Sequence, residues 1–197
     1  MDEFDEPEKK KRKPRLPKDV TPRLVREQAL RYLDRFATTT QKLQRHLFTK
    51  NRKAIELYDL DEATVQKVID TEIEKLISAG IMDDQEYADS KARSMARQGK
   101  SKRQIVGKLF TLGLDENHSD HAITELEDVG GHTDKIGAAK YIKKRRFGPY
   151  KDTATQKDRS QKELLTLVRN GFSYALGEKL LSLETIEEIE NIIYGEQ

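Results

Sequence analysis

The sequence contains no cysteine and no long hydrophobic run, and each absence removes a class of protein. Without cysteine, the 197-residue chain has no disulfide, no thiolate metal ligand and no cysteine nucleophile, as is common in a reducing compartment. No apolar stretch approaches membrane-spanning length, and no signal-peptide core is present. These absences favour a soluble, cytoplasmic protein.

Catalytic motifs are also missing. The sequence has no glycine-rich phosphate loop, no Gly-x-Ser-x-Gly turn and no defensible Ser/His/Asp arrangement. Asp83 and Asp84 are better explained as a helix cap and its neighbour than as an acid pair. A zinc site at His118, His121 and His132 competes with an ordinary helix and turn. We therefore expect a binding protein that is not an enzyme and uses neither a cofactor nor a metal.

Apolar residues are few and charged residues are many. Hydrophobic residues make up 35% of the chain and charged residues 37%, and the mean hydropathy is −0.84, so one large core is excluded. Lysine and arginine (37) nearly balance aspartate and glutamate (35), which leaves a net charge of +2. The position of the charges is therefore more informative than their sum.

Residues 1–20 are expected to form a disordered, charged N-terminal arm. Five acidic residues precede Lys9, the basic run Lys9–Arg15 follows, and three prolines are interspersed. The basic run has three interpretations: a nuclear-localisation signal, an electrostatic tether to nucleic acid, or a tail that only improves solubility.

Helical periodicity dominates the remainder of the chain. The strongest pattern runs from Asp61 to Ala79, where apolar residues recur three, four and seven positions apart, and Gly80 follows it. No segment alternates with period two, so the predicted fold is all-α. The first helix, after Thr21-Pro22, is expected to bury Val25, Ala29, Tyr32, Leu33 and Phe36.

Start signals mark two helices in the central stretch 80–114. Asp83 and Glu86 have the spacing of a capping box, and Ser101 and Gln104 repeat that spacing before the next helix. The stretch therefore predicts a helical hairpin with a basic outer face.

The sequence also repeats itself. The segment Thr39–Asn51 aligns without a gap to Ser101–Gly113, and a looser third copy runs from Asp158 to Gly171. This predicts an elongated array of three tandem three-helix repeats, because one such unit cannot bury its apolar face alone. We place the repeats at 21–80, 81–128 and 133–182, and we expect 183–197 to be an acidic C-terminal helix or tail.

The central stretch resembles the signature of the RecX family, regulators of the bacterial recombinase RecA. The likeness lies in Gly80-Ile-Met-Asp-Asp-Gln-Glu-Tyr-Ala88 and Arg103-Gln104-Ile105, and it recurs in Arg146-Phe147-Gly148-Pro149 and Leu167–Phe172. Tyr87 stands where phenylalanine is commoner. The resemblance implies three tandem three-helix repeats that bind RecA filaments on single-stranded DNA and inhibit ATP hydrolysis, strand exchange and coprotease activity.

Two basic clusters are the candidate interface for the RecA filament and the single-stranded DNA backbone. On one side of stacked repeats they would form a positive track for phosphates or for an acidic protein groove. The alternative is a solvated helix face. The clusters are Lys91, Arg93, Arg97, Lys100, Lys102 and Arg103, and then Lys140, Lys143, Lys144, Arg145 and Arg146.

Two other functions compete with that of a filament regulator. The first is a helical-repeat protein that acts directly on DNA, and the second is a scaffold with only protein partners. In each case we expect a monomer without membrane contact.

Removing residues 1–18 is expected to leave the melting temperature unchanged, because this segment lacks a helical apolar pattern. Thermal unfolding of a chain that begins near Thr21, followed by circular dichroism, tests this. A drop of several degrees would show that the arm packs against the body.

Overall fold

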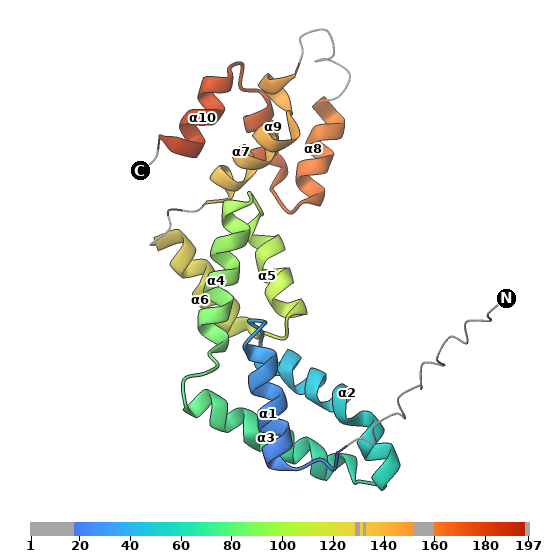
Figure 1. Ribbon diagram of the computed structural model, residues 1–197. Helices are drawn as coiled ribbons and strands as arrows, with labels where there is room; N and C mark the ends of the chain where they lie inside the picture. Colours follow the sequence, from blue (N-terminus) through green and yellow to red (C-terminus); the bar gives the residue numbers. More distant parts are fainter. Residues whose placement is uncertain (1–17, 129–130, 132, 152–159, 196–197) are drawn as a thin grey trace, which may run out of the picture.

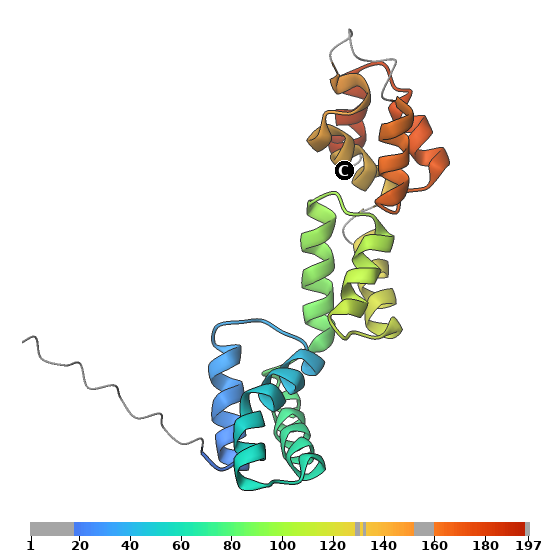
Figure 2. The same cartoon turned by 90° about the vertical axis from the view of Figure 1, so that its right-hand side faces the viewer.

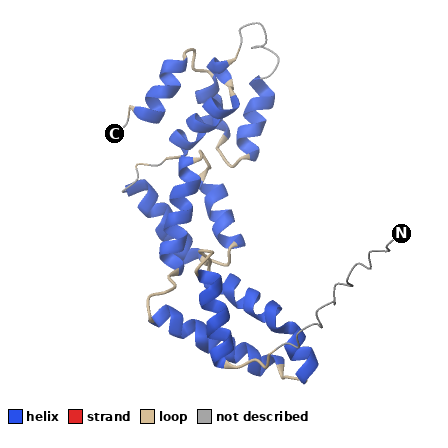
Figure 3. Ribbon diagram, viewed as in Figure 1, coloured by secondary structure: helices blue, strands red, loops and turns tan. Residues whose placement is uncertain are grey.

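The computed structural model describes residues 18–128, 131, 133–151 and 160–195, and within these ranges every regular element is a helix (Figures 1 and 3). The all-α prediction is confirmed. None of the described helices is both long and apolar enough to cross a membrane. The helices are α1 (Pro22–Leu33), α2 (Thr40–Tyr58), α3 (Glu62–Ser78), α4 (Asp84–Arg97), α5 (Lys102–Thr111), α6 (Glu116–Asp128), α7 (Asp134–Arg145), the short 3-10 helix η1 (Gly148–Tyr150), α8 (Ser160–Arg169), α9 (Tyr174–Leu181) and α10 (Ile186–Tyr194).

Three separate hydrophobic clusters lie along an elongated body (Figures 1 and 2). The first joins α1, α2 and α3, the second joins α4, α5 and α6, and the third joins α7, α8, α9 and α10. The repeat boundaries 21–80, 81–128 and 133–182 stay predictions compatible with these clusters. At their edges, Val20 and Met82 pack with the first cluster, and Ile189 of α10 packs with the third. Residues 1–17 of the predicted arm lie outside the described residues.

The first helix ends earlier than predicted. α1 stops at Leu33, and Phe36 is 56% exposed instead of lying on the inner face. The reason is the start of α2, whose N-cap residue Thr39 needs extended backbone (φ −86°, ψ 157°). The helix must therefore end at Leu33, although the helical pattern of apolar residues continues to Phe36.

Each of the two predicted capping boxes forms only one of its two sets of bonds, the one in which the N-cap side chain accepts from the backbone. The Asp83 carboxylate accepts from the backbone N–H groups of Gln85 and Glu86 at 2.8 and 3.0 Å. The Ser101 hydroxyl accepts from the backbone of Gln104 at 3.2 Å. The return bonds are replaced by longer-range contacts: the carboxylate of Glu86 pairs with an arginine of α4, and the amide of Gln104 donates to a residue of α8–α9.

A pair of hydrogen bonds joins the first helical unit to the second. The Thr39 hydroxyl, besides capping α2, donates to the carbonyl oxygen of Leu112 at 2.6 Å. The next backbone N–H, that of Thr40, donates to Asp84 Oδ1 at 2.8 Å. The start of α2 is thereby bonded both to the end of α5 and to the start of α4.

The junction between the second and third units repeats the same two bonds. The Ser101 hydroxyl donates to the carbonyl oxygen of Asn170 at 2.7 Å, and the backbone N–H of Lys102 donates to Asp134 Oδ1 at 2.9 Å. First-turn N–H groups have no partner within their own helix, so they are available for this role. The repeat found in the sequence therefore extends to the contacts between units.

Glycine is required where these junctions close. Gly113 and Gly171 directly follow the two accepting carbonyls and have φ values of +85° and +90°. A Cβ atom on Gly171 would lie 2.5 Å from Ser101 Oγ and 3.1 Å from Arg103 Cβ, whereas one on Gly80 (φ +68°) would meet nothing within 4 Å.

This difference gives a matched pair of variants. Gly80→Ala should cost about 1–2 kcal/mol of unfolding free energy, the penalty of a left-handed alanine. Gly171→Ala should cost at least about 1 kcal/mol more, because its methyl group also displaces the neighbouring unit. Urea unfolding measures both, and equal losses would show that the junction yields without strain.

Candidate interface for nucleic acid and protein

Basic and acidic residues are concentrated on different helices. The second helix of each unit (α2, α5 and α8) is basic: α5 has no acidic residue, α2 has only Glu56, and the Glu163 of α8 is buried. α6 and α10 are acidic and contain neither lysine nor arginine. In Figure 1, α2, α5 and α8 lie on the right of the body, and α6 and α10 lie on the left.

The exposed cations of the second helices form what we call the basic edge, and Figure 2 shows the molecule from the side on which α2, α5 and α8 lie. In the part of the chain that the structure describes, none of these side chains makes an ion pair with a carboxylate. The basic edge consists of Lys42, Arg45, Lys50, Lys53, Arg103, Lys108, Lys162 and Arg169.

Three of the cations predicted from sequence are bound to acidic residues instead. Each joins the first or second helix of its unit to the acidic side, so its charge is already compensated. The hydrogen bond from Lys143 to Glu190 also raises the pKa of this lysine. The pairs are Arg93 with Glu86 and Glu125 (3.3 and 3.0 Å), Lys102 with Glu127, and Lys143 with Glu190 (2.7 Å).

Two basic hollows gather several of the others. Lys91 and Lys100 line a groove of about 550 Å³ between α4 and α5 together with Lys108 of the basic edge, and none of the described residues that line it is acidic. Arg145 and Arg146 line a smaller pocket, of about 240 Å³, between the end of α7 and α8. The other predicted cations without an acidic partner in the described ranges are Arg97, Arg103, Lys140 and Lys144.

Sequence reasoning missed the cations of α2, as well as Lys108, Lys162 and Arg169. A signal for the first group was present, because residues 40–53 contain five lysines and arginines and no acidic residue. Counting charge by predicted helix, instead of by consecutive run, would have found it.

No family model matches the chain, but curated proteins do. The regulatory protein RecX of Myxococcus xanthus is 29% identical over 175 residues, which cover 88% of this chain and 92% of the relative. The regulatory protein RecX of Agrobacterium fabrum is 31% identical over 169 residues, which cover 86% and 87%. The chain belongs to the RecX family. A third RecX, of Streptococcus uberis, is 29% identical over 135 residues, or 66% of this chain and 48% of the relative.

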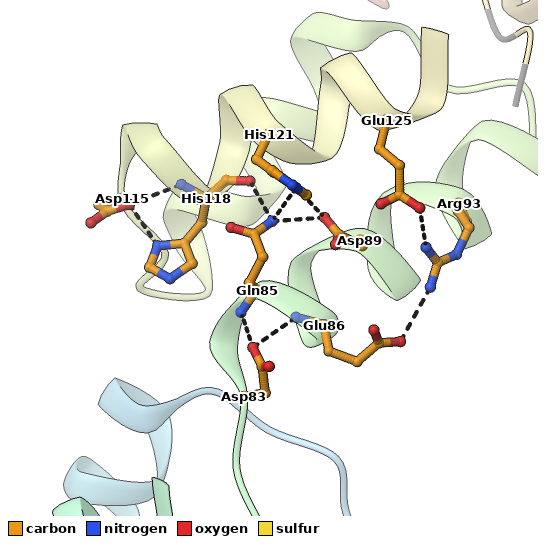
Figure 4. A network of polar contacts seen from close by, with 9 residues as sticks. All are labelled: Asp83, Gln85, Glu86, Asp89, Arg93, Asp115, His118, His121 and Glu125. Atoms are coloured by element: carbon orange, nitrogen blue, oxygen red, sulfur yellow. Dashed lines mark hydrogen bonds and ion pairs between the residues drawn. The ribbon is translucent and has the colours of Figure 1, made fainter. Parts of the chain in front are cut away.

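The acidic residues of the RecX-like signature have structural partners in this chain, and Figure 4 shows those of Asp83 and Glu86. Asp83 caps α4, and Asp84 accepts the junction bond from the backbone of Thr40. The Gln85 amide lies 2.7 Å from Asp89 Oδ1 and 2.9 Å from His121 Nδ1, and so it joins α4 to α6. These contacts account for the aspartate pair without acid–base chemistry.

The histidines do not assemble as a three-histidine site within the described residues. The carboxylate of Asp115 accepts the backbone N–H of His118 at 3.0 Å and contacts its ring Nδ1 at 2.6 Å, and these two bonds lower the pKa of Asp115. His132 lies outside the described residues. His121 instead lies within 4.8 Å of Asp89 and Glu125. Because Gln85 and Arg93 already donate to these carboxylates, we assign this group to the packing of α4 on α6.

In this RecX-family chain, replacing an arginine that forms ion pairs should lower the free energy of unfolding more than replacing one without an acidic partner in the described residues. Arg93→Ala breaks two ion pairs and should lower the free energy of unfolding by about 1 kcal/mol. Arg97→Ala, on the same helix, should change it by less than about 0.5 kcal/mol. Chemical denaturation at low salt tests the pair, and equal effects would show that the Arg93 contacts add no stability.

Proposed function

We propose that this protein regulates the recombinase RecA in the cytoplasm. It binds RecA filaments assembled on single-stranded DNA and inhibits their ATP hydrolysis, strand exchange and coprotease activity. It acts as a monomer, by binding and without turnover. The observation that carries the proposal is family membership over most of the chain, since relatives covering 86–88% of it are regulatory RecX proteins.

The shape and charge of the molecule support this role. Units stacked end to end give a long, narrow body that can contact several protomers of a helical filament. The basic edge runs over all three units, as a ligand with repeated negative charge requires. Both the phosphates of single-stranded DNA and an acidic protein groove meet that requirement.

A second function is favoured by the two basic hollows. A helical-repeat protein that acts directly on DNA would also need grooves without acidic residues, such as the one lined by Lys91, Lys100 and Lys108. Affinity for naked DNA separates the two functions. Tight binding with a steep salt dependence, in the absence of recombinase, favours direct action. Weak naked-DNA binding with strong inhibition of filaments favours the regulator.

The decisive experiment titrates the protein into RecA that is hydrolysing ATP on single-stranded DNA. Hydrolysis should fall as the protein is added. Unchanged hydrolysis at excess protein would contradict the proposal.

Charge reversal then locates the contact surface. Arg103→Glu/Lys108→Glu in the second unit and Lys144→Glu/Arg145→Glu in the third should each raise the half-inhibitory concentration several-fold, and the combination should raise it further. All four residues are exposed, so circular dichroism should show intact helices.

The matched control reverses two exposed cations away from the basic edge, Lys67 of α3 and Lys179 of α9. Lys67→Glu/Lys179→Glu changes the net charge equally and should inhibit like the parent. If the control weakens inhibition as much as the two double variants, only the net charge matters. If no variant weakens inhibition, the partner binds another face.

A further inference from the structure

The pocket between the end of α7 and α8 has an unusual set of lining residues. Its volume is about 240 Å³, and three elements contribute to it: the end of α7, the residue after η1, and α8. The lining side chains that carry the argument are Arg145, Arg146, Phe147, Lys151, Lys162 and Thr166.

Among the described residues, one acidic side chain lines the pocket, and its charge is already neutralised. Glu163 is buried; its Oε1 lies 2.5 Å from Lys151 Nζ, and its Oε2 accepts the backbone N–H of Gly148 at 3.2 Å. The side chains of Lys151 and Glu163 are each only 8% exposed, so they form a closed, internally paired unit. The Lys151–Glu163 pair therefore does not compensate the charges of Arg145, Arg146 and Lys162.

These three cations have no acidic partner in the described part of the chain. Lys143, only two residues before Arg145, lies 2.7 Å from Glu190 of α10, so one cation of the same helix is compensated by α10. Like charges gathered in one place repel one another. The arrangement is favourable when an anion occupies the space between them.

The backbone at Arg146 strengthens this inference. This residue ends α7 in the left-handed conformation (φ 54°, ψ 50°), which is strained for any residue with a Cβ. Glycines hold the left-handed positions after α3, α4, α5 and α8, as they do at most helix ends of this kind, and Asp59 holds the one that ends α2. Backbone stability alone would therefore favour glycine at position 146. What arginine adds is a guanidinium group at the pocket.

The chemistry of the lining identifies the class of anion. Guanidinium groups match the oxygens of a phosphate, to which they donate two parallel hydrogen bonds, and Lys162 adds a compact charge from the opposite wall. Phe147, with the guanidinium of Arg145 lying 5.8 Å from its ring centre, adds aromatic surface beside these donors. Aromatic surface next to phosphate donors suits a nucleotide better than inorganic phosphate.

We propose that the pocket lined by Arg145, Arg146 and Lys162 binds the phosphate group of a nucleotide, with Phe147 contacting the attached sugar or base. The inference deepens the proposed function and rests on it for its biological setting, because the pocket adjoins the basic edge. The nucleotide has two sources, a unit of a polynucleotide chain or a free nucleotide. The test distinguishes them.

The experiment measures the fluorescence anisotropy of a labelled oligothymidylate with the full-length protein and without recombinase. Lys162→Ala and Arg146→Gly should each weaken binding about threefold to tenfold, as expected for the loss of one charge-assisted contact in a partly exposed site. Arg146→Gly should at the same time raise the melting temperature, because it relieves the left-handed backbone. Lys179→Ala, an exposed lysine of α9 in the same unit, is the matched control and should bind like the parent.

Competition identifies the source of the phosphate. Displacement of the labelled strand by adenosine triphosphate, but not by inorganic phosphate, assigns a free nucleotide. Displacement only by unlabelled oligonucleotide assigns the polynucleotide backbone. The proposal is overturned if the parent does not bind the oligonucleotide at low salt, or if both pocket variants bind it like the control. Neither result depends on recombinase, so failure here is distinct from failure to inhibit RecA.

Discussion

The structure depends on one repeated interaction, a helix-capping hydroxyl that also donates a hydrogen bond to the next unit. Thr39 and Ser101 each accept from the backbone of their own helix and donate to a carbonyl at the end of the following unit's second helix. A hydroxyl can do both, since it is donor and acceptor at once. An aspartate cap would satisfy the helix equally well but could not donate. The choice of threonine and serine here therefore follows from the array as well as from the helix.

Polar junctions suit a chain with so few apolar residues. Each of the three cores is small and lies within its own unit, so little apolar surface remains to join the units. Hydrogen bonds are directional and tolerate only a narrow range of distances and angles. They fix the orientation of neighbouring units even where they add little net free energy. Orientation is what an extended binding surface requires.

Local features of the fold were predictable, and distant pairings were not. Asp83 and Ser101 cap helices because of residues two or three positions away, and those contacts are visible in the sequence. The bond from Thr39 joins residues 73 positions apart. It is equally hard to predict from the sequence whether a lysine is paired with a carboxylate. Lys143 contacts Glu190 only because α10 packs on α7. The basic runs lie on α4, α5 and α7, so they share only α5 with the basic edge, and they did not separate compensated cations from those without an acidic partner in the described residues.

The second helices of the first two units, α2 and α5, each combine two roles, and this combination relates binding to assembly. The first turn of each bonds to the next unit, while its solvent face carries cations of the basic edge. The spacing of cations along the body is therefore set by the junctions. A ligand that contacts two successive second helices binds best when the intervening junction is closed. By linkage, that ligand must also stabilise the closed junction. A long anionic partner is thus able to select one shape of the array, which a short ligand confined to one unit cannot do.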